Sequence, residues 1–110
     1  MKISTREETG HVILRLEGEV DLHHSPTLRK ALMDLMLVNR AVIVDLGQVE
    51  YIDSSGIASL VEAYQMTRRN GGRFVLANIS LAAMRVLQLA RLDKVFTLAD
   101  SVEAALSIGA

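Results

Sequence analysis

Two neighbouring serines beside an acidic residue are the side chains of this sequence best suited to chemistry. Asp53, Ser54 and Ser55 stand in a row and are followed by Gly56. A serine hydroxyl becomes a nucleophile only next to a general base that a third group orients. The sequence lacks Gly-x-Ser-x-Gly, and its three histidines all stand within the first 24 residues. We therefore predict no catalytic residues and no enzymatic activity. On spacing alone, the polar run is interpreted as the start of a helix.

Other kinds of site find little support in the residues. His23 and His24 are adjacent, but neighbouring side chains on a loop diverge and no third ligand is evident, so no metal site is predicted. The chain has no cysteine, which excludes disulfides and thiolate chemistry. Phosphate-binding motifs of the Gly-x-x-x-x-Gly-Lys and Gly-x-Gly-x-x-Gly types are missing, so we predict no cofactor.

The charge balance argues against nucleic acid as a partner. Twelve basic and 13 acidic residues give a formal net charge of −1, whereas phosphate contacts need a concentrated basic face. Arg68, Arg69 and Arg73 come nearest to such a patch, but without interleaved aromatic residues they are interpreted as a solvated helix end.

Length and hydropathy predict one soluble domain. A chain of 110 residues is too short to divide into two useful cores, so we expect a single domain over residues 1–110. The first residues lack the apolar segment of a signal peptide, and the longest stretch without charge or histidine, Phe74 to Met84, is too short to cross a bilayer. We expect a cytoplasmic monomer with no membrane partner.

Hydrophobic periodicity places these residues on elements. Between Lys2 and Glu17 the pattern predicts two strands joined at Thr9-Gly10, of which the first is polar except for Ile3 and so lies at a sheet edge. Short apolar runs predict buried strands at residues 41–44, 74–77 and 95–98.

Four helices alternate with these strands. Capping residues mark the four helix starts, at Ser25-Pro26, Asp53, Ser80 and Asp100, the last with Glu103 in a capping box. Asn or Gly marks two of the helix ends, at Asn39 and at Asn70-Gly71-Gly72. The third helix is apolar on more than one side, and core packing of Leu81, Met84 and Leu89 is favoured over a second interface.

The order ββαβαβαβα predicts an α/β fold with a mixed, mostly parallel sheet of four to five strands and about four helices. Asp53, Ser54 and Ser55 would then lie where a buried strand turns into a helix. Ligands and partners of open α/β sheets gather at such turns.

Several motifs, in register from Gly18 to Phe96, are similar to those of one family. They are Gly18-Glu19-Val20-Asp21 with His23, His24 and Ser25, then Asp53-Ser54-Ser55-Gly56, Arg69-Asn70-Gly71-Gly72-Arg73, Asn78-Ile79-Ser80 and Leu92-Asp93-Lys94-Val95-Phe96. The sequence resembles a STAS domain over almost its whole length, and specifically the anti-sigma factor antagonists.

That resemblance implies a function switched by phosphate. It implies that Ser55, and less favourably Ser54, is phosphorylated by an anti-sigma factor that is also a serine kinase. The unmodified protein would bind this anti-sigma factor and release sigma factor, and a serine phosphatase would restore binding. The expected partner surface comprises Asp21, His23, His24, Ser25, Asp53, Ser54, Ser55, Gly56, Ile57 and exposed positions of the second helix.

Two alternatives stay open at this point. Asp21 is equally well interpreted as a turn residue that binds nearby backbone amides. STAS domains also serve as accessory subunits of lipid-transport or stress-signalling scaffold complexes, and in such a protein Ser55 would be a structural helix cap.

Overall fold

The strands of the sheet follow one another in chain order. The computed structural model describes residues 1–38 and 41–108. Its five-stranded sheet has the order β1-β2-β3-β4-β5: β1 (Lys2–Glu8), β2 (His11–Val20), β3 (Ala41–Ile52), β4 (Phe74–Ala77) and β5 (Thr97–Ala99). β1 is antiparallel to β2, and every other neighbouring pair is parallel. The mixed, mostly parallel α/β sheet predicted from the sequence is confirmed.

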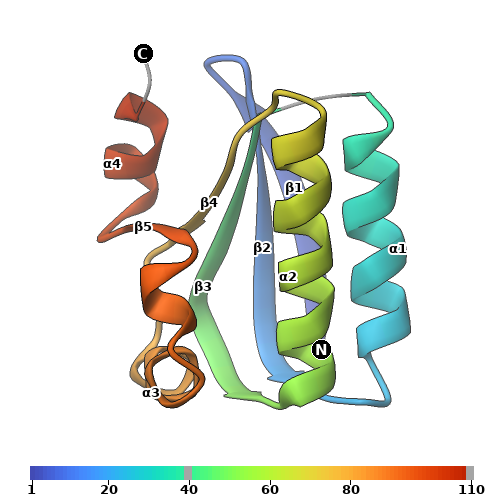
Figure 1. Ribbon diagram of the computed structural model, residues 1–110, viewed down its shortest axis with the longest axis vertical. Helices are drawn as coiled ribbons and strands as arrows, with labels where there is room; N and C mark the ends of the chain where they lie inside the picture. Colours follow the sequence, from blue (N-terminus) through green and yellow to red (C-terminus); the bar gives the residue numbers. More distant parts are fainter. Residues whose placement is uncertain (39–40, 109–110) are drawn as a thin grey trace.

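The helices divide unequally between the two faces of the sheet. They are α1 (Ser25–Met36), α2 (Ser54–Arg69), α3 (Leu81–Leu89) and α4 (Val102–Ser107), with a short 3-10 helix, η1 (Leu92–Lys94), before β5. Figure 1 shows α1 and α2 side by side across the sheet. Buried residues of α1, α2 and α3 share one large apolar cluster with the sheet, whereas α4 packs in a smaller cluster on the opposite face.

The central strands are buried on both faces, which explains their nearly continuous apolar sequence. In β2, Leu14 and Leu16 face the large cluster and Ile13 faces the small one. All three side chains are fully buried. The polar β1 lies at the sheet edge, as predicted, and the turn between β1 and β2 places Thr9 and Gly10 at positive φ.

Two predicted helix caps are off by one residue. Ser25 is the buried first residue of α1 rather than its cap, and the cap position is held by His24 without a side-chain hydrogen bond. The cap of α4 is Ser101, whose hydroxyl accepts a hydrogen bond from the Ala104 amide at 3.0 Å, and not Asp100. The predicted caps Asp53 and Ser80 are confirmed. The predicted helix end at Asn39 lies outside the described residues.

Two further predictions need correction. The last strand occupies Thr97–Ala99 instead of residues 95–98, because the amides of Val95 and Phe96 both bind the Leu92 carbonyl in η1. Leu81 and Leu89 do not pack in the core but are 70% and 86% exposed. α3 buries Ala83 and Leu87 instead.

Candidate functional site

Asp53 organises the start of α2. It precedes the helix in an extended conformation, so its carboxylate folds back over the first turn. Oδ1 accepts hydrogen bonds from the amides of Ser55 at 3.0 Å and Gly56 at 3.1 Å. The same oxygen accepts a hydrogen bond from the Ser55 hydroxyl at 2.6 Å. A single carboxylate oxygen thus holds both the backbone and the side chain of Ser55.

The second oxygen of Asp53 reaches the segment after β2. Oδ2 accepts a hydrogen bond from the Leu22 amide at 2.9 Å, and the Asp53 amide donates to the Val20 carbonyl at 3.2 Å. The Ser55 hydroxyl bond is the main cause that lowers the pKa of Asp53. Burial opposes that change, and bonds from the amides of Gly56, Leu22 and Ser55 add to it. The Asp53 side chain is therefore ionised at neutral pH, and its hydrogen bonds join the start of α2 to the segment after β2.

Asp21 closes the turn between β2 and α1. Its Oδ1 accepts hydrogen bonds from the His24 amide at 3.1 Å and from His24 Nδ1 at 2.7 Å. Its carbonyl accepts from the Ser25 amide at 2.8 Å. Burial opposes ionisation of Asp21, but the bonds from His24 outweigh it and leave the pKa lowered. The turn-residue interpretation of Asp21 is confirmed.

The predicted site residues differ in exposure. Ser54 and His23 are exposed, and Asp21, His24, Asp53 and Ser55 are half-buried. Ser25, Gly56 and Ile57 are buried and support the surface from beneath. A Cβ on Gly56 would lie 2.8 Å from both the Val20 carbonyl oxygen and Val20 Cγ1, so only glycine lets α2 begin this close to β2.

Leu22 belongs to the site although it was not among the predicted residues. Its amide binds Asp53, yet its side chain is 72% exposed. Together with Asp21, His23 and Asp53 it lines a shallow hollow. In the sequence, the signal that could have indicated Leu22 was a large apolar residue between polar turn residues.

An apolar groove runs from Ser54 between α2 and α3. It has a volume of about 410 Å³ and is lined by Ser54, Ile57, Ala58, Val61, Glu62 and Gln65 of α2 and by Val86 and Ala90 near α3. Glu62 accepts two hydrogen bonds of 2.8 Å from Arg29 of α1. That ion pair fixes the neighbouring helix against the groove wall.

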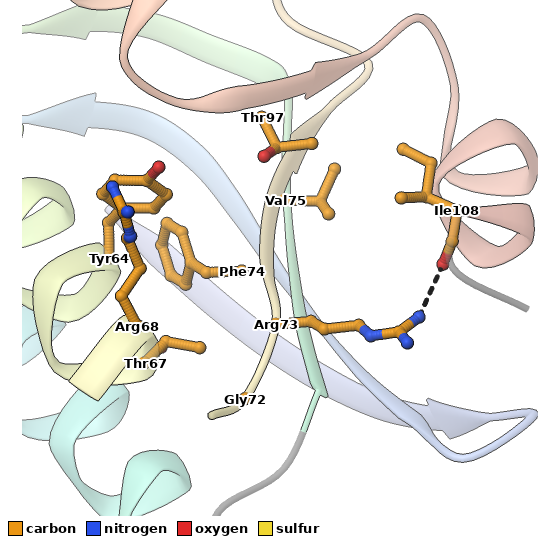
Figure 2. Close-up of a pocket in the computed structure, with 9 residues that line it drawn as sticks. All are labelled: Tyr64, Thr67, Arg68, Gly72, Arg73, Phe74, Val75, Thr97 and Ile108. Carbon is orange, nitrogen blue, oxygen red and sulfur yellow. Dashed lines mark hydrogen bonds between the residues drawn. The ribbon is translucent and has the colours of Figure 1, made fainter. Parts of the chain in front are cut away.

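A second pocket lies at the other end of α2 (Figure 2). It includes Arg68 and Arg73. From the rise per residue of an α-helix, Arg68 lies roughly 20 Å along the helix axis from Ser55. Figure 2 shows Arg73 reaching the Ile108 carbonyl oxygen, to which it donates at 3.0 Å. The Arg68 guanidinium lies 5.7 Å from the centre of the Tyr64 ring. Both arginines are exposed, and neither belongs to the serine site.

Metal-binding clusters and membrane-spanning helices are both absent from the described part of the chain. Within residues 1–38 and 41–108, no three His, Asp or Glu side chains gather as a metal site would require. Within the same residues, no helix has the length and apolar character of a membrane span.

Comparison with known proteins gives one family match and several similar chains. Residues 2–105 match the family model described as STAS domain. The "Anti-sigma-B factor antagonist" of Bacillus subtilis (strain 168) is 23% identical over 103 residues, which cover 94% of each chain. A crystal structure of an anti-sigma factor antagonist from Mycobacterium paratuberculosis has a TM-score of 0.88 and 26% identity, covering 96% of this chain and 91% of that one.

A further solved structure is that of the Bacillus cell fate determinant SpoIIAA in its phosphorylated form. Its TM-score is 0.75 with 21% identity, and the alignment covers 96% of each chain. The curated relatives' names describe regulatory binding proteins and not enzymes, in agreement with the expectation from the sequence.

Proposed function

Because this chain belongs to the STAS domain family, we propose that it is an anti-sigma factor antagonist switched by phosphorylation of Ser55. In its unmodified form it binds an anti-sigma factor that is also a serine kinase, and this binding releases sigma factor for transcription. Phosphate on Ser55 ends the binding, and a serine phosphatase restores it. The protein acts as a cytoplasmic, single-domain monomer.

The observation that carries this proposal is the placement of the Ser55 hydroxyl. It lies at the first turn of α2, next to the exposed Ser54 and bonded to Asp53. A helix start is a position that accepts added negative charge without breaking the helix. The relatives named as antagonists support the same function, and a structural neighbour is known in a phosphorylated form.

The surroundings of Ser55 favour a binding surface over an active site. The one side chain that hydrogen-bonds its hydroxyl, among the residues that the structure describes, is the Asp53 carboxylate. His24, whose Nδ1 donates to Asp21, makes no hydrogen bond to the Ser55 hydroxyl. Without an imidazole on the hydroxyl, the constellation for acyl transfer is incomplete.

The partner surface has an acidic and an apolar part. The acidic part is the turn with Asp21 and His23, fastened to Asp53 through the Leu22 amide. The apolar part is the exposed Leu22 side chain and the groove between α2 and α3 that starts at Ser54. An anti-sigma factor that presents apolar side chains beside a basic group complements this surface.

Binding of Ser55 variants tests the switch. Ser55→Ala removes only a hydroxyl and should bind the organism's anti-sigma factor kinase as the unmodified protein does. Ser55→Asp should bind at least about 10-fold more weakly, because a misplaced charge at an interface costs more than 1.4 kcal/mol. Ser107→Asp, which adds the same charge to an exposed position of α4, is the matched control and should bind normally.

Titration calorimetry gives the three affinities, and the intact mass after incubation with kinase and ATP shows whether one phosphate is added. Equal affinity of Ser55→Ala and Ser55→Asp would contradict the switch. Absence of both phosphate and binding would favour the alternative, an accessory subunit of a transport or scaffold complex in which Ser55 only caps a helix.

A further inference from the structure

The two neighbouring serines have different chemical surroundings. The Ser54 side chain is exposed, and none of the described residues hydrogen-bonds its hydroxyl. The Ser55 hydroxyl instead donates to Asp53 Oδ1 at 2.6 Å. A distance this short is typical of a charge-assisted bond between a hydroxyl and an ionised carboxylate.

We propose that Asp53 is the residue that positions the Ser55 hydroxyl for phosphoryl transfer and so makes Ser55, rather than Ser54, the phosphate acceptor. The inference rests on the proposed function and adds to it the group that selects between the two serines.

The carboxylate is suited to this role because its own position is fixed. Backbone amides bind both of its oxygens: those of Ser55 and Gly56 on Oδ1, and that of Leu22 on Oδ2. These amides belong to two different segments, α2 and the turn after β2, so the carboxylate cannot rotate without breaking bonds to at least one of them.

A fixed acceptor orients the attacking oxygen. With its proton directed to Asp53, the Ser55 hydroxyl keeps its lone pairs pointed away from that carboxylate, where a partner's ATP can approach. The Ser54 hydroxyl has no such restraint and must lose rotational freedom during the reaction. Positioning of the nucleophile is a large part of catalysis in phosphoryl transfer.

The transfer step balances with ATP as the phosphate donor. Ser55 Oγ forms a bond to the γ-phosphorus, and the bond from that phosphorus to the oxygen bridging the β- and γ-phosphates breaks. ADP leaves with the electron pair of that bond. The proton of the hydroxyl passes along the existing hydrogen bond to Asp53 and from there to water.

The test replaces the carboxylate while keeping its shape. Asp53→Asn retains an oxygen that can accept from the Ser55 and Gly56 amides but removes the charge and the proton acceptor. With the anti-sigma factor kinase and ATP, kcat for phosphate incorporation at Ser55 should fall about 100-fold, the low end for a lost proton acceptor. The KM for the antagonist should change less than about threefold. The fraction of phosphate on Ser54, located by fragment mass spectrometry, should rise.

Two further variants separate positioning from helix capping. Asp53→Ser keeps a good neutral cap and should lose kcat in the same way. Ser101→Ala removes the cap of α4, far from the site, and should leave phosphorylation unchanged.

The outcomes are distinguishable. Wild-type kcat at Ser55 in Asp53→Asn, with wild-type protein phosphorylated normally, would overturn this inference and leave the proposed function standing. Wild-type kcat in Asp53→Ser would also overturn it, because a neutral cap would then be sufficient and the carboxylate would not be needed. If wild-type protein takes up no phosphate at Ser55, the proposed function itself fails.

Discussion

Asp53 uses its two carboxylate oxygens for different segments of the chain. Oδ1 serves the start of α2, and Oδ2 holds the turn after β2 through Leu22. Because all these donors stabilise the ionised form, the pKa of Asp53 lies below its ordinary value of 3.8. The hydrogen bonds of the ionised carboxylate therefore contribute to the stability of the fold.

This lowered pKa predicts how stability depends on pH. The unfolded chain binds a proton at Asp53 near the ordinary pKa, so between that value and the lower folded pKa the unfolded state holds more protons. The contribution of Asp53 to stability is complete above pH 3.8 and is lost as the pH falls through the folded pKa. Thermal melts from neutral pH to about pH 3 should show Asp53→Asn less stable than wild type at neutral pH, with the difference shrinking in acid.

Asp34→Asn is the matched control for that experiment. Asp34 is exposed and pairs with Lys30 across one helix turn at 3.1 Å, an interaction worth a few tenths of a kcal/mol. Its melting curves should follow wild type throughout. A constant difference between Asp53→Asn and wild type at all pH values would show that the carboxylate charge is not what stabilises the fold.

The cap at Asp53 was predictable from the sequence because capping depends on local geometry. The bond from Leu22 to Asp53 was not, since it joins residues 31 positions apart. At α4, Asp100 and Ser101 both suit a cap, and residue types alone do not decide between them. The extended backbone of Ser101 decides it in the structure.

At the scale of elements, the position of the site depends on how closely α2 approaches the sheet. A Cβ on Gly56 would lie 2.8 Å from the Val20 carbonyl oxygen and 2.9 Å from Ile52 Cγ1. Those atoms belong to the ends of β2 and β3. The helix start therefore rests directly on the two strands that carry the site's segments.

Gly56→Ala should consequently destabilise the protein. In an ordinary helix this change stabilises by about 1 kcal/mol, but here the added methyl group overpacks the strand ends, at a cost of about 1–3 kcal/mol. Urea unfolding measures the difference. Ser54→Ala, at the exposed neighbouring position, is the control and should lie within about 0.5 kcal/mol of wild type. A stabilised Gly56→Ala would show that the helix has room to move outward.

The lengths of the strands were harder to predict than their existence. The apolar run 41–44 identified β3, but the strand continues to Ile52 through polar residues such as Gln48 and Glu50. The parallel pairing of β2 with β3 has two irregularities, one of them next to Gly18, which has a positive φ. Hydrophobic periodicity alone does not identify the second half of β3, where several residues are exposed.

On the scale of the whole molecule, phosphate on Ser55 should leave the fold intact. The new charge sits at the positive end of α2, which favours an anion by about 0.3–1 kcal/mol, and Asp53 opposes it. The phosphorylated oxygen can no longer donate to Asp53, so the disturbance should reach as far as that carboxylate's other partner, the Leu22 amide.

Amide hydrogen exchange of modified and unmodified protein measures how far from Ser55 the effect of the phosphate extends. Changes should be confined to residues 53–57 and the turn around Leu22, with little change in melting temperature. The small cluster beneath α4 on the opposite face, with Val75 and Ala105, serves as the internal control and should exchange at the same rate in both forms. Changes spread across the sheet would indicate a conformational switch instead.

The chain-order sheet also bears on how the protein is made. Each strand after β1 pairs with the one that precedes it in the chain, so one of its partners has already been synthesised when it emerges. Paired residues of the parallel strands, such as His11 and Ala41 or Val42 and Phe74, are about 30 positions apart, and each such loop costs a similar closure entropy. At roughly 5–20 residues per second, the ribosome supplies each new strand and helix within seconds of the last. The sheet can thus grow from β1 toward β5 during translation. The segment with Asp53 and Ser55 then emerges onto a β2 strand that is already available to receive it.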